Sequence, residues 1–212
     1  TLVVHDDSVL LNQAEEVALF EDKTADQIAE TLITDKDLEA DVESVPAAGA
    51  AYKRYVVQRG TAMQLLRDLA RRHGMFVYVK PGETAGGKSI CVFAKPALQP
   101  GDAPELLLVG EERNISKFSV RFDGLQPMAA CAGSVRISDK SLLQSETLIP
   151  EVDALGDEAV HAALAPTAMS LLAHAREEQN DLDAATLAAV DLSSFAYTAT
   201  AELDAGDYDH VL

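Results

Sequence analysis

The chain has 212 residues, of which 48% are hydrophobic and 25% charged, a composition typical of a globular protein with one large or two small domains. It carries 17 Lys and Arg against 35 Asp and Glu, so its formal net charge at pH 7 is -18. This charge repels a polyphosphate backbone and excludes nucleic-acid binding by bulk electrostatics.

The acidic residues are concentrated at the two ends of the chain. Residues 1–50 hold 13 acids and 2 bases, residues 51–150 hold 9 acids and 14 bases, and residues 151–212 hold 13 acids and 1 base. Such segregation is typical of solvated faces or of complementary surfaces that meet in an assembly, and the sequence does not distinguish the two. No run of residues approaches the roughly 20 apolar positions of a membrane helix, and the first residues lack the pattern of a signal peptide.

Two helices are predicted in the first third. From Thr24 the apolar residues recur at helical spacing, and Thr24 with Gln27 forms a capping box that satisfies backbone donors at the helix start. The same pattern recurs at Thr61 with Gln64, and Gly74 supplies a C-terminal stop after a basic last turn.

Strands are predicted around the second helix. Residues 55–58 lead into it, residues 75–80 follow with alternating apolar positions, and a Gly-rich turn returns the chain through residues 90–93. Prolines and glycine between residues 96 and 104 interrupt regular structure and predict a domain boundary. The fold class predicted is therefore α+β. A small α/β element of strand, helix and hairpin occupies residues 1–100, and a second domain occupies residues 101–212.

The second domain is predicted to contain long strands and a helical insertion. Segments 106–109, 115–122 and 129–137 are interpreted as a meander, with Asp123-Gly124 as a turn signal. Helices are predicted at 166–178 and 182–192, and strands at 195–201 and 208–212. We expect these strands to form most of an antiparallel β-barrel.

One pattern matches a phosphate-binding loop. Residues 82–89 have the spacing G-x-x-x-x-G-K-S, in which backbone amides would hold phosphates, Lys88 would meet their charge and Ser89 would bind magnesium. Such a loop must open a helix. The residues after Ser89 are apolar and β-branched, so we interpret the segment as the tip of a hairpin.

Other side chains capable of chemistry do not form a specific arrangement. His5, His210 and their neighbouring acids are adjacent along a strand or turn, so they cannot by themselves close a metal shell. Cys91 and Cys131 lie in apolar, strand-like surroundings with no Cys-x-x-Cys pattern, which predicts buried, unreactive thiols in a reducing compartment. The sequence therefore predicts no catalytic, cofactor-binding or metal-ligating residue.

Residues 55–79, which read YVVQRGTAMQLLRDLARRHGMFVYV, are distinctive as a unit. They resemble the hallmark of the phage late-control protein D and VgrG superfamily, a "Y-x-x-Q" strand, a capped helix ending "LA-x-x-x-G", and an aromatic strand. Residues 20–29 resemble the helix entry "D-K-T-x-x-x-I-A" of the same family, and residues 118–122 and 134–139 resemble the first strands of its following barrel. The family-motif residues are Thr24, Ile28, Tyr55, Gln58, Thr61, Leu66, Leu69, Ala70 and Gly74.

The resemblance implies a structural function. Members of this family are baseplate hubs of contractile injection machines: phage tails, type VI secretion systems and phage-tail-like particles. Each subunit has two related β-barrels with an α/β element between them, and three subunits form a ring that joins the tail tube to the trimeric spike. The resemblance implies a homotrimer with tail-tube and spike proteins as partners, and with other baseplate proteins or effectors as further candidates. It implies assembly in the bacterial cytoplasm into a virion tail or a secreted particle. On this basis we expect the chain to be a piece of a longer hub subunit whose first barrel precedes Thr1.

Two alternatives stay open at the level of sequence. The first is an adaptor that uses the hub scaffold to hold an effector or cargo, which would need an exposed apolar patch outside the trimer contacts. The second is a nucleotide-binding enzyme built on residues 82–89, for which replacement of Lys88 by Ala should abolish nucleotide binding. We expect a non-enzymatic protein without a cofactor.

Overall fold

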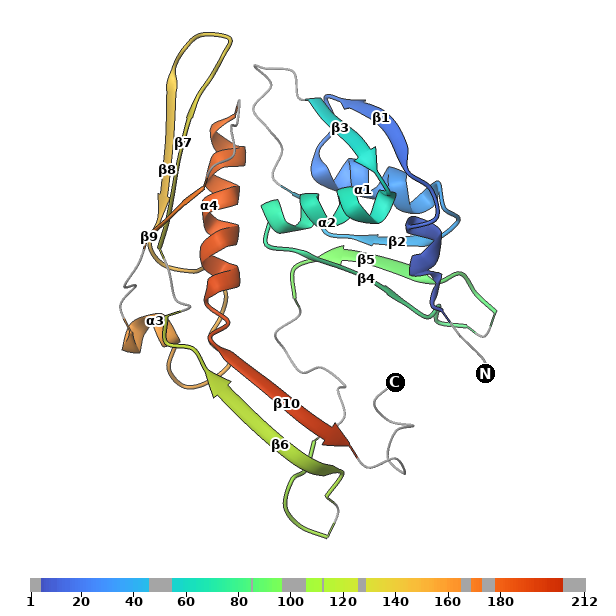
Figure 1. Cartoon of the computed structure of the whole chain (residues 1–212), viewed down its shortest axis with the longest axis vertical. Helices are drawn as coiled ribbons and strands as arrows, with labels where there is room; N and C mark the ends of the chain where they lie inside the picture. The colour runs from blue at the N-terminus through green and yellow to red at the C-terminus, as the bar shows by residue number, and fades with distance from the viewer. Residues whose placement is uncertain are drawn as a thin grey trace.

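The computed structural model describes residues 5–45, 55–84, 86–96, 106–111, 113–125, 129–164, 169–172 and 178–203. Helices and strands both occur throughout these ranges, which confirms the predicted α+β class. The first half forms a layered unit, and the second half consists of two separate small sheets connected by a long helix (Figure 1).

In the first unit, two helices lie between two sheets. A short 3-10 helix (Asp7–Leu11) precedes β1 (Glu16–Glu21), which pairs antiparallel with β3 (Tyr55–Gly60). A second sheet has the order β2-β5-β4, from β2 (Glu39–Val42), β5 (Ile90–Ala94) and β4 (Phe76–Lys80). Helices α1 (Ala25–Thr34) and α2 (Ala62–Arg72) fill the space between the sheets (Figure 1).

The sequence pattern explains why this unit forms. The predicted capping box of α2 is present: Thr61 Oγ1 accepts from Gln64 N at 3.2 Å, and Gln64 Oε1 accepts from Thr61 N at 3.0 Å. At α1, Gln27 Oε1 accepts from Thr24 N at 3.1 Å. The apolar stripes of both helices face inward, and together with residues from both sides they form the main core of the described chain. Its fully buried members include Leu11, Ile28, Ile33, Leu66 and Phe93.

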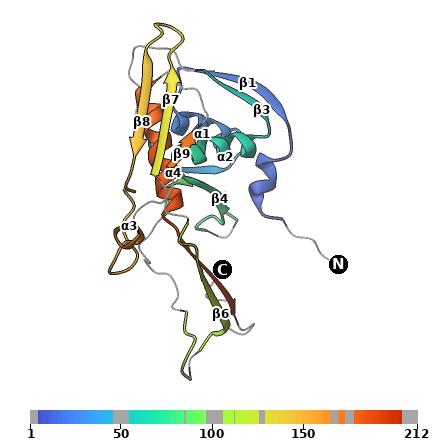
Figure 2. The same ribbon diagram turned by 60° about the vertical axis from the view of Figure 1, so that its left-hand side comes forward.

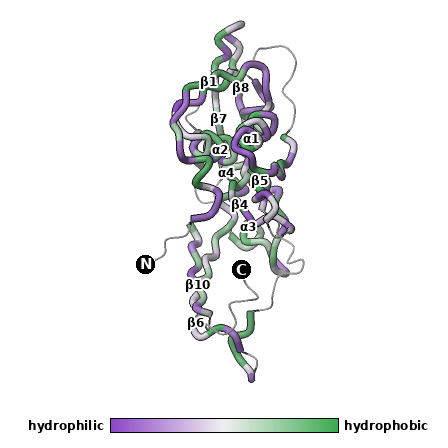
Figure 3. The backbone as a smooth tube through the Cα atoms, turned by 90° about the vertical axis from the view of Figure 1, so that its right-hand side faces the viewer, coloured by the Kyte–Doolittle hydropathy of each residue, from purple (hydrophilic) through white to green (hydrophobic). Residues whose placement is uncertain are grey.

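The second half begins with a two-stranded ribbon. Strand β6 (Ile115–Phe122) pairs antiparallel with β10 (Tyr197–Leu203), and the two strands extend away from the rest of the chain (Figure 3). A separate sheet has the order β8-β7-β9, in which β7 (Ala129–Val135) pairs antiparallel with β8 (Leu142–Thr147) and parallel with β9 (Met169–Leu172). A single helical turn, α3 (Val160–Ala163), lies between β8 and β9 in the chain.

Helix α4 (Gln179–Ser193) connects the two halves. One side of it packs on β7 and β8, and another side contacts α2 (Figure 2). Thr186 is fully buried, and its hydroxyl lies 2.9 Å from Ser145 Oγ and 3.0 Å from Thr147 Oγ1, which fixes α4 on β8. The buried carboxylate of Asp191 accepts from Glu151 N at 2.8 Å and holds the loop after β8.

Several predictions for the second half are wrong. Residues 106–109 are not a strand, because the backbone of Leu107 accepts from the amides of Asn114 and Ile115 within a local loop. The expected meander does not form: β6 pairs with β10, which is distant in sequence, although Asp123-Gly124 does lie at a turn. Residues 169–172, predicted as helical, form β9 because they pair with the first residues of β7.

Other predictions for this half are confirmed or lie outside the described ranges. The helix predicted at 182–192 is α4, and the strand predicted at 195–201 is β10, which begins at Tyr197. The strand predicted at 208–212 and most of the proline-rich boundary lie outside the described residues. The described strands of the second half form two separate sheets, with the orders β10-β6 and β8-β7-β9.

Candidate functional site

The family-motif residues form the framework of the first unit. Ile28, Leu66, Leu69 and Ala70 are buried in its core, while Tyr55 is 57% exposed on the outer face of β3. Gln58 is buried and donates from Nε2 to Gly60 O at 3.1 Å, whereas its Oε1 has no hydrogen-bond partner among the described residues. The structure thus gives these positions packing and capping roles and does not bring them together as a site with reactive groups.

The backbone at Gly74 favours glycine, and the residue also lies close to α4. Its φ of +66° lies in the left-handed region, where L side chains are strained. A Cβ added at Gly74 would lie 3.4 Å from the Cα of Ala188 on α4. The end of the α2 motif is therefore also the point where the first unit meets the connecting helix. The sequence indicated the glycine at the helix end but not its proximity to α4, because that contact joins residues far apart in the chain.

The segment resembling a phosphate-binding loop is a hairpin tip. Residues 81–89 connect the antiparallel strands β4 and β5, and β5 starts directly after Ser89, as predicted. Lys88 forms an ion pair with Asp37, and Ser89 Oγ donates to Asp7 Oδ2 at 2.6 Å. Both side chains that would serve a nucleotide are therefore bonded to carboxylates, which would repel phosphate.

The prediction of buried thiols is confirmed for Cys91 and wrong for Cys131 in β7, which is only half-buried. Cys91 is fully buried in β5, and its burial raises the pKa of the thiol to about 11. Within the described ranges, no group of three His, Cys, Asp or Glu residues is placed to hold a metal ion. The helices of those ranges are also too short or too polar to cross a membrane.

The ribbon of β6 and β10 carries an uncovered apolar face. The register places Phe122 opposite Tyr197, Val120 opposite Ala199 and Phe118 opposite Ala201; we call these six residues the apolar ribbon face. The rings of Phe122 and Tyr197 contact each other with centroids 4.8 Å apart. The opposite face carries Lys117, Ser119 and Arg121 against Thr198, Thr200 and Glu202.

This face is exposed although it is apolar. Phe118 is 48% exposed, Val120 53% and Tyr197 61%, and both strands are solvent-accessible over nearly their whole length. An isolated two-stranded ribbon is marginal in water, and adjacent exposed apolar side chains are typical of an interaction site. A second exposed group lies on the outer side of β1 and β3, where Val17, Leu19 and Val57 face solvent.

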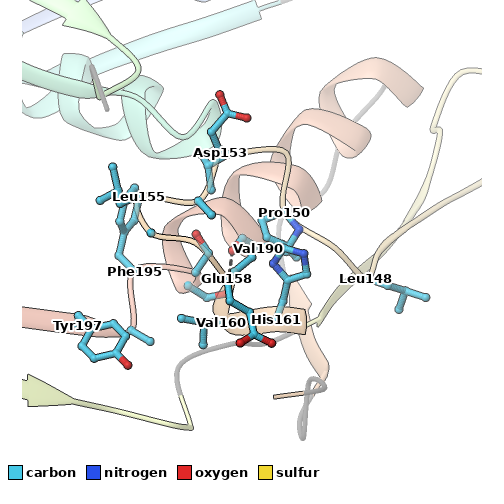
Figure 4. Close-up of a pocket in the computed structure, with 17 residues that line it drawn as sticks. Leu148, Pro150, Asp153, Leu155, Glu158, Val160, His161, Val190, Phe195 and Tyr197 are labelled. Carbon is cyan, nitrogen blue, oxygen red and sulfur yellow. Dashed lines mark hydrogen bonds between the residues drawn. The ribbon is translucent and has the colours of Figure 1, made fainter. Parts of the chain in front are cut away.

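A cavity of about 490 Å³ lies where the ribbon joins α4. It is formed by the loop after β8, the C-terminal end of α4 and the first residues of β10 (Figure 4). Its apolar lining includes Leu148, Leu155, Val160, Val190, Phe195 and Tyr197, and its polar lining includes Asp153, Glu158 and His161. Sequence reasoning did not predict this cavity, because its walls come from segments that only the tertiary structure brings together.

Comparisons with known proteins identify similar folds. No protein-family model matches the chain, and no curated protein matches it significantly. The crystal structure of the 43 kDa tail protein of prophage MuSo2 from Shewanella oneidensis is similar to 87% of this chain, with a TM-score of 0.51 and 13% identity. A tail protein from Neisseria meningitidis MC58 matches 92% of this chain, with a TM-score of 0.48 and 15% identity.

The matched region spans about half of each of these proteins, 51% of the Shewanella protein and 56% of the Neisseria protein. At 13% identity the likeness concerns the fold alone. Over most of its length, the chain therefore has a fold similar to that found in a phage tail protein.

Proposed function

We propose that this chain is a structural component of a phage-type contractile tail, in which it acts as part of a baseplate hub that joins the tail tube to the spike. The observation that carries the proposal is the fold likeness to the prophage MuSo2 tail protein over 87% of the chain. The family motif in residues 55–79 supports the same assignment through residues that build the core of the first unit.

The surface chemistry also supports an assembly role. The apolar ribbon face and the outer side of β1 and β3 are apolar areas that a monomer would leave in water. Each strand of the ribbon also has an edge to which no described strand is bonded, and such edges are commonly paired or covered in assemblies. We propose that the apolar ribbon face contacts neighbouring subunits of a homotrimer.

The test is the oligomeric state of the purified chain. Sedimentation velocity should show a trimer that dissociates when Val120 is replaced by Glu, because a charge would then enter the apolar contact. The matched control is Ser119→Glu, which places the same charge on the opposite face of the same strand and should leave the trimer intact.

Two results would contradict the proposal. One is a chain that stays monomeric at every concentration, and the other is equal loss of the trimer in the Val120 and Ser119 variants. Negative-stain electron microscopy should show the assembled species as a threefold ring, which separates a hub from a simple dimeric contact.

A further inference from the structure

The cavity at the base of the ribbon has the properties of a binding site. Its volume of about 490 Å³ falls within the range of known ligand pockets, and its lining is mostly apolar with a few polar groups. Tyr197 belongs both to this lining and to the apolar ribbon face, so the cavity opens next to the surface proposed above to contact other subunits.

Most residues of the segment 151–158, which we call the acidic loop, line the cavity, and the segment carries four carboxylates and no Lys or Arg. The four are Glu151, Asp153, Asp157 and Glu158, of which Asp153 and Glu158 line the cavity. Figure 4 shows Asp153 with its carboxylate directed away from the other labelled side chains of the cavity. Lys95 shares a smaller neighbouring depression with Glu151 and Asp153, but no Lys or Arg is among the described residues that line the cavity itself.

The occupant must therefore complement two features at once. The apolar interior favours a bulky apolar group, because insertion of that group removes its own apolar surface and that of the cavity lining from water. Glu158 belongs to the cavity lining and is exposed, so its carboxylate favours a positive charge next to that group. An apolar ligand without a positive charge would fill the interior but would leave the carboxylate of Glu158 without an opposite charge.

We propose that this cavity docks an extended segment of a partner protein, which inserts one bulky apolar side chain and places a neighbouring Lys or Arg against the acidic loop. The choice of a polypeptide rests on the proposed assembly role, because the cavity opens beside the apolar ribbon face. The size of the cavity and the charge of its lining do not depend on that role.

The probe is a yeast-displayed library of random short peptides selected against the purified chain. Enriched peptides should share a bulky apolar residue with Lys or Arg close to it in sequence. The proposal is overturned if no peptide is enriched, or if the enriched peptides are neutral or acidic. It is also overturned if phenylalanine amide binds as tightly as the best peptide, since the site would then recognise a small molecule.

Comparing variants at the cavity with control variants elsewhere tests whether the peptides bind in the cavity. Replacement of Leu155 by Asn should weaken the best peptide roughly tenfold by removing an apolar lining residue, and Glu158→Gln should also weaken it and reduce its salt dependence. The controls are Leu19→Asn and Glu30→Gln, which make the same changes on exposed sites of the first unit. Equal losses in the test and control variants would overturn the proposal.

The outcome can be separated from that of the hub proposal. If the chain is monomeric but binds these peptides at the cavity, the result contradicts the proposal of a trimeric hub and supports the proposed docking site. If the chain is a trimer but binds none of these peptides, the result supports the hub proposal and contradicts the proposed docking site.

Discussion

The two halves of the chain bury apolar residues to very different extents. Seventeen buried side chains form the core cluster of the first unit, whereas the cluster of the second half has three members, Ala132, Leu143 and Leu182, among the described residues. The first unit encloses two amphipathic helices between two sheets, so its apolar stripes have partners within the same hundred residues. The second half spreads its strands over a ribbon and a small sheet, and its apolar residues remain largely exposed.

This difference indicates where each half obtains its stability. We expect the first unit to obtain most of its stability from its own core of closely packed side chains. The strands of the second half gain stability from α4, from the residues of the first unit that α4 contacts, and, in the proposed function, from other subunits. The predictions below test this contrast.

The largest expected effect comes from core truncation. Replacing Leu66, which is fully buried in α2, by Ala should lower the free energy of unfolding of the first unit by about 2–5 kcal/mol. Replacing Leu143 in the small cluster should cost about 1–2 kcal/mol, at or below the lower end of that range, because fewer side chains surround it. Urea denaturation followed by circular dichroism measures both. Equal losses would contradict the proposed difference between the halves.

A smaller effect is expected at the junction of the two halves. Gly74→Ala should cost about 1–2 kcal/mol for its left-handed backbone, and we expect a small further loss because the added Cβ would lie 3.4 Å from Ala188 Cα, at the lower limit of ordinary contact. Gly86→Ala is the matched control, since Gly86 has a φ of +81° but no atom within 4 Å of an added Cβ. The same denaturation experiment should show a greater loss for Gly74. If the two losses are the same, the contact with α4 does not contribute.

The last prediction compares the reactivity of the two cysteine thiols in the unmodified chain, with no substitution that would alter its stability. Burial raises the pKa of Cys91 from its ordinary value of 9.0 to about 11, so its thiolate fraction at pH 8 should fall about 100-fold. Cys131 in β7 is only half-buried and should react with iodoacetamide first. Mass spectrometry of the native chain measures the two rates, and the Cys91 rate should rise as the pH approaches 11. Urea-unfolded protein, in which both thiols should react, is the control, and equal native rates would refute the expected difference.

The first unit was predictable from sequence because its signals are local. The capping boxes at Thr24 and Thr61, the apolar spacing of both helices and the Gly74 stop each involve residues within a few positions of one another. The hairpin between β4 and β5 was predictable for the same reason, since a glycine-rich turn separates two apolar strands. Such patterns depend on helix and strand geometry that is the same in most proteins.

The second half was less predictable because its pairings join distant segments. Strand β6 pairs with β10 about 80 residues later, and residues 169–172 become a strand only because β7 offers them a backbone edge. The cavity escaped prediction for the same reason, since its walls include Leu155 from a loop, Val190 from α4 and Tyr197 from β10.

By itself, the sequence determined the α+β class, the two capped helices, the hairpin at residues 81–89 and the concentration of negative charge after residue 150. Only the tertiary structure decided that the ribbon leaves an apolar face in solvent, that Gly74 meets Ala188, and that acidic residues border an apolar cavity. The physical reason is the range of the interactions. Helix caps and apolar periodicity act within a few residues, whereas sheet pairing and cavity formation depend on which distant segments the folded chain brings into contact.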